Sequence, residues 1–290
     1  MKTKSAEDNL IFHYTSIEAL FKILRREHES LTKENFKDKI CLRATHAKFL
    51  NDPTEYELAL SLLEQSLLNY EKENPSKNGL SRLIKEYDTS KLLLLAPPGE
   101  PYLFALSEHP DNLSMWRAYG INGTGVSIGL DKKMLFDYEN ENSNTLFSPC
   151  YYDLDENISR LSTFWSSIYD KMPLYINEGK IEGKTARDFL DFLKIIRHCF
   201  SIKSSAYIDE KEWRLCSLRT PKDVKYRIRS GLIIPYIEHY FSKDIIKKIV
   251  IGPCVDIALS EKSIKMALET FRYDTKNISL TISKVPYRSQ

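Results

Sequence analysis

The stretch that decides the fold reads Asp209-Glu210-Lys211-Glu212-Trp213-Arg214-Leu215 and combines carboxylates, cations and an indole. In an extended strand, side chains two residues apart lie on the same face. Glu210, Glu212 and Arg214 would then share one face, backed by a more apolar face that carries Trp213 and Leu215. This pattern predicts a strand that holds a carboxylate beside a ligand, and it is equally typical of an ordinary half-buried strand.

Short apolar segments on both sides of this stretch predict further strands. We expect them at residues 10–14, 40–44, 102–107, 126–130, 147–152, 224–228, 231–237, 248–252 and 278–283. Helical spacing of apolar residues predicts helices at about 15–24, 54–70, 157–175, 185–202 and 260–271, and Asp111 is expected to cap a short helix that carries Trp116. Without a regular βαβ repeat, these elements indicate an α+β fold.

The 290 residues are expected to form a single domain, residues 1–290, with a helical insertion at about 153–203 in a β-rich body. Near the N-terminus a strand runs directly into a helix, where Thr15 and Glu18 have the spacing of a capping box. His13 is therefore expected where a strand ends and a helix begins, close to the positive end of the helix dipole.

The composition is that of an ordinary globular protein, with 42% hydrophobic residues and a net charge of +2. The five cysteines are odd in number and lack a Cys-x-x-Cys pair, which argues against a disulfide framework. Neither the cysteines nor the six histidines show metal-ligand spacing, so no metal is expected. No signal segment and no apolar run of ~20 residues is found, so we expect a cytoplasmic protein that does not enter a membrane.

The positive charge gathers between Arg219 and Arg229, where Lys222, Lys225 and Arg227 are opposed only by Asp223. This run is typical of a solvated strand-turn-strand edge. Alternatively, it forms a surface that attracts phosphate or an acidic partner.

Three loci carry candidate chemistry, although each alone is typical of ordinary structure. They are His13-Tyr14-Thr15, the strand 102–107 ending in Ser107 with Trp116 and Tyr119 beyond it, and Glu210-x-Glu212-x-Arg214. The glycines at 120, 123 and 125 have the wrong order for a dinucleotide fingerprint and lack the lysine of a phosphate-binding loop. No Gly-x-Ser-x-Gly motif indicates a serine hydrolase.

Several motifs in the same order resemble a widespread bacterial family catalogued as a domain of unknown function, number 2971. They are Phe12-His13-Tyr14-Thr15-Ser16, Leu50-Asn51-Asp52-Pro53-x-Glu55, Ala105-Leu106-Ser107-Glu108-x-x-Asp111-x-Leu113-x-Met115-Trp116-x-x-Tyr119-Gly120, Gly125-Val126-x-Ile128, Glu210-x-Glu212-x-Arg214 and Ile282-Ser283-x-x-Pro286-Tyr287-Arg288. The resemblance covers most of the chain, apart from about 71–100 and 153–203.

The opening strand-helix unit more distantly resembles the ADP-ribosyltransferase superfamily. That resemblance implies a mixed or antiparallel β core of short strands with an N-terminal strand-helix unit and helical insertions. One branch of the superfamily uses a histidine at a strand end, a tyrosine and a glutamate on a strand, and another uses Glu-x-Glu. This chain combines His13 of the first branch with Glu210-x-Glu212 of the second.

The resemblance implies NAD as substrate and a role for each candidate residue. Glu212 would stabilise the oxocarbenium ion at the ribose, and Glu210 would orient or deprotonate the acceptor. His13 would form a hydrogen bond with the adenosine ribose or the pyrophosphate, near Thr15 and the first helix. The remaining roles are stacking on nicotinamide by Tyr14 or Tyr119, substrate positioning by Ser107, and pairing with pyrophosphate, or support of the glutamates, by Arg214 or Arg288.

An ADP-ribosyltransferase or an NAD glycohydrolase is the function this implies, with protein, nucleic acid or water as acceptor. Such activity would suit a bacterial toxin or an antiphage effector. The alternatives are a non-catalytic nucleotide-sensing module, an RNA-processing transferase of the same fold, and a partner-binding domain. The sequence holds no signal for the oligomeric state.

Overall fold

The computed structural model describes residues 9–25, 38–52, 54–76, 81, 100–171, 176–177, 180–181, 197–219, 221–254 and 256–287. The main sheet is formed by β1 (Leu10–Thr15), β2 (Lys39–His46), β3 (Glu100–Ser107), β4 (Val126–Asp131), β5 (Thr145–Pro149), β8 (Glu212–Arg219), β9 (Lys225–Arg229), β10 (Leu232–Ser242), β11 (Ile246–Ile251) and β12 (Ser279–Ile282). Each predicted strand overlaps one of these, so the α+β class is confirmed.

The sheet is open and largely antiparallel, because among the described strands only β11 and β12 pair in parallel. Its described order is β12-β11-β4-β1-β3-β2-β10-β9, and β8 and β5 extend it from the other edge of β3. A separate two-stranded sheet joins β6 (Ile176–Asn177) to β7 (Lys180–Ile181).

Strand β3 is the branching point of this sheet. One edge pairs with β8 along its whole length, from Glu100 to Ser107. The other edge pairs first with β2, at Leu103, and then with β1, at Ser107. Two wings of the sheet therefore diverge from one edge of β3.

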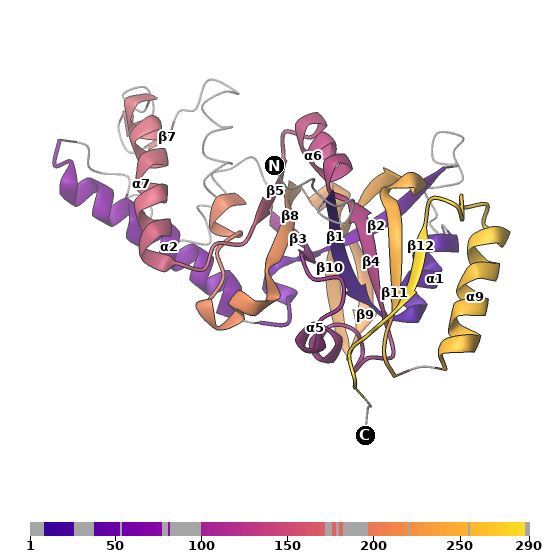
Figure 1. Cartoon of the computed structure of the whole chain (residues 1–290). Coiled ribbons are helices and arrows are strands. Elements are labelled where there is room, and N and C mark those ends of the chain that lie inside the picture. The colour runs from indigo at the N-terminus through magenta and orange to yellow at the C-terminus, as the bar shows by residue number, and fades with distance from the viewer. Residues whose placement is uncertain are drawn as a thin grey trace, which may run out of the picture.

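The helices are α1 (Ile17–Arg25), α2 (Thr54–Glu73), α5 (Leu113–Ala118), α6 (Lys132–Glu141), α7 (Leu154–Lys171) and α9 (Ile257–Thr270). Figure 1 shows α2 and α7 side by side at one end of the molecule, with α1 and α9 at the other. In the part of the chain that is described, none of the helices combines the length and the apolar character that crossing a bilayer requires.

The two faces of the sheet bury different cores. On one face, leucines and isoleucines of the strands pack against α1 and α9, as Leu20 and Ile264 do. The other face packs against α2 and α7 through residues such as Leu67 and Trp165. Farther along that face, Trp116 of α5 packs on Phe12 in a smaller cluster. Between these two clusters the face is polar.

The structure corrects one predicted helix cap and contains one helix that was not predicted. The cap of α5 is Asn112, whose side chain accepts hydrogen bonds from the backbone N–H groups of Ser114 and Met115. The carboxylate of Asp111 instead accepts a hydrogen bond from the indole N–H of Trp116 at 2.6 Å. Helix α6 was not expected, because its apolar periodicity is weak; Asp131 caps it.

The deciding stretch is not one continuous strand, which corrects a further prediction. Glu210 ends a 3-10 helix, Ser205–Glu210, and β8 begins only at Glu212. Between them Lys211 adopts the left-handed conformation with φ of 40°. The predicted helix at 185–202 lies outside the described residues up to 196, and Arg288 also lies outside them.

Candidate functional site

A buried cluster of five charged side chains fills the polar part of the sheet face between α2 and α5. Its members are Glu55, Lys203, Glu210, Glu212 and Arg214. They come from the first turn of α2, from the segment before the 3-10 helix, from that helix and from β8. The cluster therefore joins segments that are far apart in the chain.

Lys203 and Arg214 bind the three carboxylates between them. Lys203 Nζ lies 2.5 Å from Glu212 Oε2, 2.6 Å from Glu210 Oε2 and 3.4 Å from Glu55 Oε1. Arg214 donates from Nε to Glu212 Oε1 at 2.6 Å and from Nη2 to Glu55 Oε2 at 2.7 Å. Glu212 thus has a cation on each of its two carboxylate oxygens.

The cluster carries an excess of negative charge. Three carboxylates face two cations, which leaves one negative charge when all five groups are ionised. Burial alone would raise the pKa of Glu212, but Arg214 and Lys203 outweigh it and hold that pKa below its usual value. At Glu55 burial dominates and raises the pKa, so Glu55 takes up a proton before Glu212 does.

Glu210 is the outermost carboxylate of the cluster. Its side chain is 13% exposed, against 7% for both Glu55 and Glu212. The hydroxyl of Tyr119 donates to Glu210 Oε1 at 2.9 Å. A ligand that approaches from solvent would therefore meet Glu210 and Tyr119 first.

The backbone around Glu210 is held in place by side chains on neighbouring segments. Ser204 caps the 3-10 helix by accepting from the N–H of Ala206. The buried hydroxyl of Ser107 donates to the Glu210 carbonyl at 2.7 Å and accepts from the N–H of His109. Ser107 thus positions the turn that carries Glu210, and its only O–H is donated within the chain.

His13 lies on the face of the sheet opposite to Glu212. Phe12 pairs with Ser107, which pairs with Glu212, so these three side chains share one face. Because neighbouring residues alternate, the side chain of His13 points to the other face. Its ring stacks 4.4 Å from that of Phe104.

The imidazole of His13 meets a backbone carbonyl at the branch of the sheet. Its Nδ1 lies 3.0 Å from the carbonyl oxygen of Ala105, between the β2 and β1 pairings of β3. Burial lowers the pKa of His13, and Arg227 lowers it further, although the bond to Ala105 raises it. The structure therefore brings Ser107, Tyr119, Glu210, Glu212 and Arg214 together, and leaves His13 apart from them.

The other two predicted ligand-binding residues near His13 also lie outside the cluster. Tyr14 is buried against Trp116, and its hydroxyl donates to the carbonyl of His109 and accepts from the N–H of Asn112. Burial raises the pKa of Tyr14. Thr15 is half-buried, ends β1 and pairs with Val126 on β4.

Sequence reasoning missed three members of the site. Glu55 stood within the Leu50–Glu55 motif, which signalled its place near the others without giving it a role. Lys203 had no signal, because it follows the segment expected to be helical. Tyr207 was also missed: its ring lies 4.6 Å from Lys203 Nζ, and it is half-buried at the edge of the cluster.

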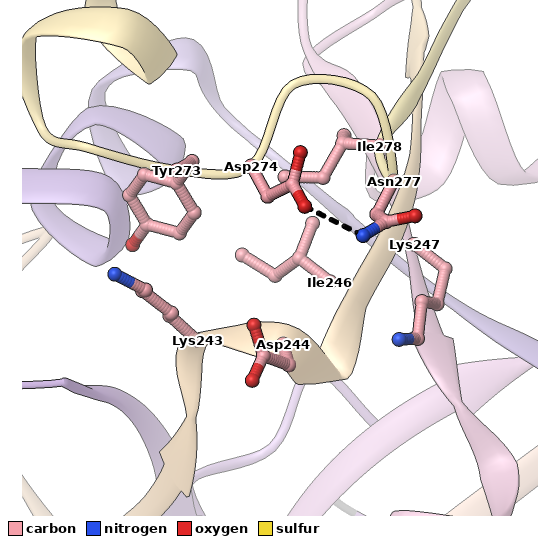
Figure 2. A pocket seen from close by; sticks show the side chains of 8 residues that line it. All are labelled: Lys243, Asp244, Ile246, Lys247, Tyr273, Asp274, Asn277 and Ile278. Carbon is pink, nitrogen blue, oxygen red and sulfur yellow. Dashed lines mark hydrogen bonds between the residues drawn. The ribbon is translucent and has the colours of Figure 1, made fainter.

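A surface pocket of about 220 Å³ lies elsewhere, beside the start of β11 and the loop after α9 (Figure 2). Two of its polar side chains already form hydrogen bonds: Asn277 donates to Asp274 at 2.6 Å, and Lys243 donates to Asp38, which lies outside the pocket lining. No predicted site residue lines it. Among the described residues, no group of His, Cys, Asp and Glu side chains is arranged to hold a metal ion.

These features define an α+β protein with a buried cluster of acidic and basic side chains on one sheet face, within the residues described. Residues 115–215 match the model of a family described as a protein of unknown function (DUF2971). The resemblance to that family is thereby confirmed over this segment, which includes Tyr119, Lys203, Glu210, Glu212 and Arg214. No curated protein and no solved structure matches the chain.

Proposed function

We propose that the cluster cleaves the nicotinamide–ribose bond of NAD and passes ADP-ribose to water or to another acceptor. The observation that carries the proposal is the excess negative charge of the cluster, whose outermost carboxylate is Glu210. Nicotinamide in NAD is a cationic ring, and the ribose becomes cationic as the bond breaks. A fixed site with net negative charge favours both.

The bond electrons leave with nicotinamide, which becomes neutral, and C1′ of the ribose becomes an oxocarbenium ion. Glu212 stabilises this cation, because Lys203 and Arg214 keep its carboxylate ionised and immobile. The oxygen of water or of an acceptor hydroxyl then forms a bond to C1′. Glu210 takes the proton released in that step, as a general base.

Aromatic rings beside the cluster suit the nicotinamide. Tyr119 and Tyr207 are both half-buried and both contact the charged groups, Tyr119 through Glu210 and Tyr207 through Lys203. Either ring can stack on a planar cation. Tyr14 and His13 have no part in this proposal, because Tyr14 is buried under α5 and His13 lies on the opposite face.

The test measures free nicotinamide after incubation of the full chain with NAD, with and without added protein lysate or RNA as acceptor. Glu210→Gln should lower the rate ~10²–10⁴-fold, as expected for loss of a general base. Glu212→Gln should lower it ~10²–10³-fold, as expected for loss of fixed electrostatic stabilisation. Glu156→Gln, on the exposed face of α7, is the matched control and should retain the full rate.

Absence of both NAD binding and nicotinamide release in the wild-type chain would overturn the proposal. Full activity of Glu210→Gln and Glu212→Gln would overturn the assignment of roles. Circular dichroism of each variant shows whether a lost rate reflects a lost fold, and Glu210→Gln is the safer variant because Glu210 is less buried than Glu212.

A second function, nucleotide binding without turnover, is favoured by one observation. Both oxygens of Glu212 already accept hydrogen bonds from cations within the chain. A module that only binds a nucleotide needs a rigid site and does not need a carboxylate that is free to react. Tight NAD binding without release of nicotinamide, in the presence of every acceptor tested, would favour this function over the first.

A further inference from the structure

The hairpin of β9 and β10 exposes an apolar patch at the end of the described sheet. Its side chains are 66% exposed at Tyr226, 82% at Ile228 and 66% at Ile233. Tyr226 and Ile228 are two residues apart on β9, and Ile233 is the partner of Ile228 on β10, so the three share one face. An exposed apolar face on an edge strand is a template for adding another strand.

The register of the hairpin shows which backbone groups of β9 are free. Ser230 and Gly231 connect the strands with φ of 51° and 78°, the geometry of a two-residue hairpin turn. Arg229 and Leu232, which flank this turn, form a hydrogen-bonded pair, and the pairs then alternate along the ladder. Pro235 falls opposite Tyr226 at a position that needs no N–H, as this alternation requires.

Tyr226 and Ile228 are therefore the residues whose N–H and C=O groups point away from β10. In the described sheet β9 pairs with β10 alone. The residues with exposed apolar side chains are thus the same ones that offer unpaired backbone groups at this edge. Both features lie on the same five-residue strand.

The opposite face of β9 is cationic and incompletely neutralised. It carries Lys225, Arg227 and Arg229. Lys225 pairs with Glu238 at 2.5 Å, whereas Arg227 forms no ion pair with a carboxylate among the described residues. Arg227 donates from Nη2 to Thr45, and its buried Nε has no hydrogen-bond partner in the described chain.

This charge also argues against a second copy of the chain as the occupant. A two-fold dimer through this edge would pair β9 with its own copy in antiparallel fashion. Because Tyr226 and Ile228 supply the free backbone groups on both copies, Arg227 would always face a cation of the other copy. Like charges directly opposite one another destabilise a strand pair.

We propose that β9 is a docking edge for an extended segment of an acidic partner protein, which adds to the sheet as a further strand. Residues of that segment opposite Lys225, Arg227 and Arg229 carry carboxylates. The residues between them are apolar and cover Tyr226 and Ile228. The backbone supplies affinity and the alternation supplies specificity. This inference does not depend on NAD cleavage.

The test uses fluorescein-labelled, end-blocked seven-residue peptides and fluorescence anisotropy with the full chain. One peptide alternates glutamate and valine. A second replaces glutamate by lysine, and a third has the composition of the first with all glutamates before all valines. Only the first should bind, and equal binding of the second or third would overturn the charge pattern or the alternation.

Ile228→Pro removes one outward N–H without removing a bond to β10, so the hairpin is retained. It should weaken binding of the alternating acidic peptide at least about fivefold. Met266→Gln alters an exposed apolar side chain on α9, outside the proposed docking edge, and is the control, with binding within about twofold of wild type. Circular dichroism and thermal unfolding establish that both variants fold.

Three results on peptide binding and oligomeric state would overturn the proposal. They are unchanged binding by Ile228→Pro, the absence of peptide binding at the highest concentration tested, and wild-type dimers in sedimentation that Ile228→Pro abolishes. The last result would make a second copy the occupant. Binding of a labelled single-stranded oligonucleotide that Arg229→Gln abolishes, with no peptide binding, would make nucleic acid the occupant and would also overturn it.

Discussion

Lys203 Nζ lies 2.5 Å from Glu212 Oε2, although only nine residues separate them and Glu212 begins a strand. The chain reverses between them through the 3-10 helix and the left-handed Lys211. The ion pair therefore joins the segment before the 3-10 helix to the first residue of β8. Both side chains are almost fully buried, at 3% and 7% exposure.

Replacing Lys203 tests whether the buried cluster holds the fold together. Lys203→Ala leaves three buried carboxylates with Arg214 as their one cation among the described residues, so we expect the free energy of unfolding to fall by about 3–5 kcal/mol. Urea unfolding at pH 7 measures the change. Lys22→Ala, which breaks the exposed pair of Lys22 with Glu18, is the control and should leave the free energy of unfolding nearly unchanged. Equal effects of the two variants would contradict the prediction.

The Ser107 hydroxyl should stabilise the turn before β8. Ser107→Ala leaves the carbonyl of Glu210 and the N–H of His109 without this partner, so we expect a loss of about 1–3 kcal/mol. Ser61→Ala removes an exposed hydroxyl that bonds within α2, and it should change stability by less than about 0.5 kcal/mol. A Ser107→Ala protein as stable as wild type would show that the buried hydroxyl is dispensable.

Acid should destabilise the protein partly through His239. This fully buried imidazole bonds Tyr138 at 2.9 Å, and burial lowers its pKa from 6.5 to about 3. The unfolded chain binds a proton at His239 below pH 6.5, whereas the folded chain does not. The stabilising contribution is therefore complete above pH 6.5 and falls by about 1.4 kcal/mol per pH unit between pH 6.5 and 3.

Urea midpoints of wild type and His239→Gln at pH 7 and pH 5 measure this component. The variant should be less stable than wild type at pH 7 and should lose less stability on acidification. Glu212 acts in the same direction at lower pH, because its lowered pKa gives stability that is lost as the pH falls through that pKa. The same pH dependence in both proteins would exclude His239 as a source of it.

Asp111 should tie α5 to the C-terminal segment. Its carboxylate accepts from the indole of Trp116 and the hydroxyl of Ser283, both at 2.6 Å, and from the N–H of Lys284 at 2.7 Å. Asp111→Ala should lower stability by about 1–3 kcal/mol and speed hydrogen exchange at Lys284. Asp137→Ala, on the exposed side of α6, should change neither. Unaltered exchange at Lys284 would contradict the proposed tie.

Most strands were predictable because they are short apolar runs between turn residues. The 102–107 run and β3 (Glu100–Ser107) differ only at one end. The 3-10 helix before β8 was not predictable in this way, because charged residues allow either an extended or a turning backbone. The left-handed Lys211, which ends it, is a conformation that a lysine rarely adopts and that its sequence does not signal.

The residue types of the candidate site were predictable from the sequence, but the face of the sheet on which each residue lies was not. Glu210, Glu212 and Arg214 were placed together from spacing alone, and the structure does place their side chains in one cluster. His13 was grouped with them, yet strand pairing puts it on the other face of the sheet. A strand's alternation says which residues share a face, but not which face of a neighbouring strand they join.

Local sequence by itself determined the α+β class, the order of most strands and helices, and the family resemblance, because periodicity and turn chemistry act over a few residues. Tertiary structure alone decided that Glu55 and Lys203 complete the cluster, that Glu212 is buried between two cations, and that β9 ends the described sheet with Tyr226 exposed. These are contacts between segments up to 159 residues apart, such as Arg214 with Glu55. No local pattern encodes such pairings, because their energy arises only when the sheet has brought the segments together.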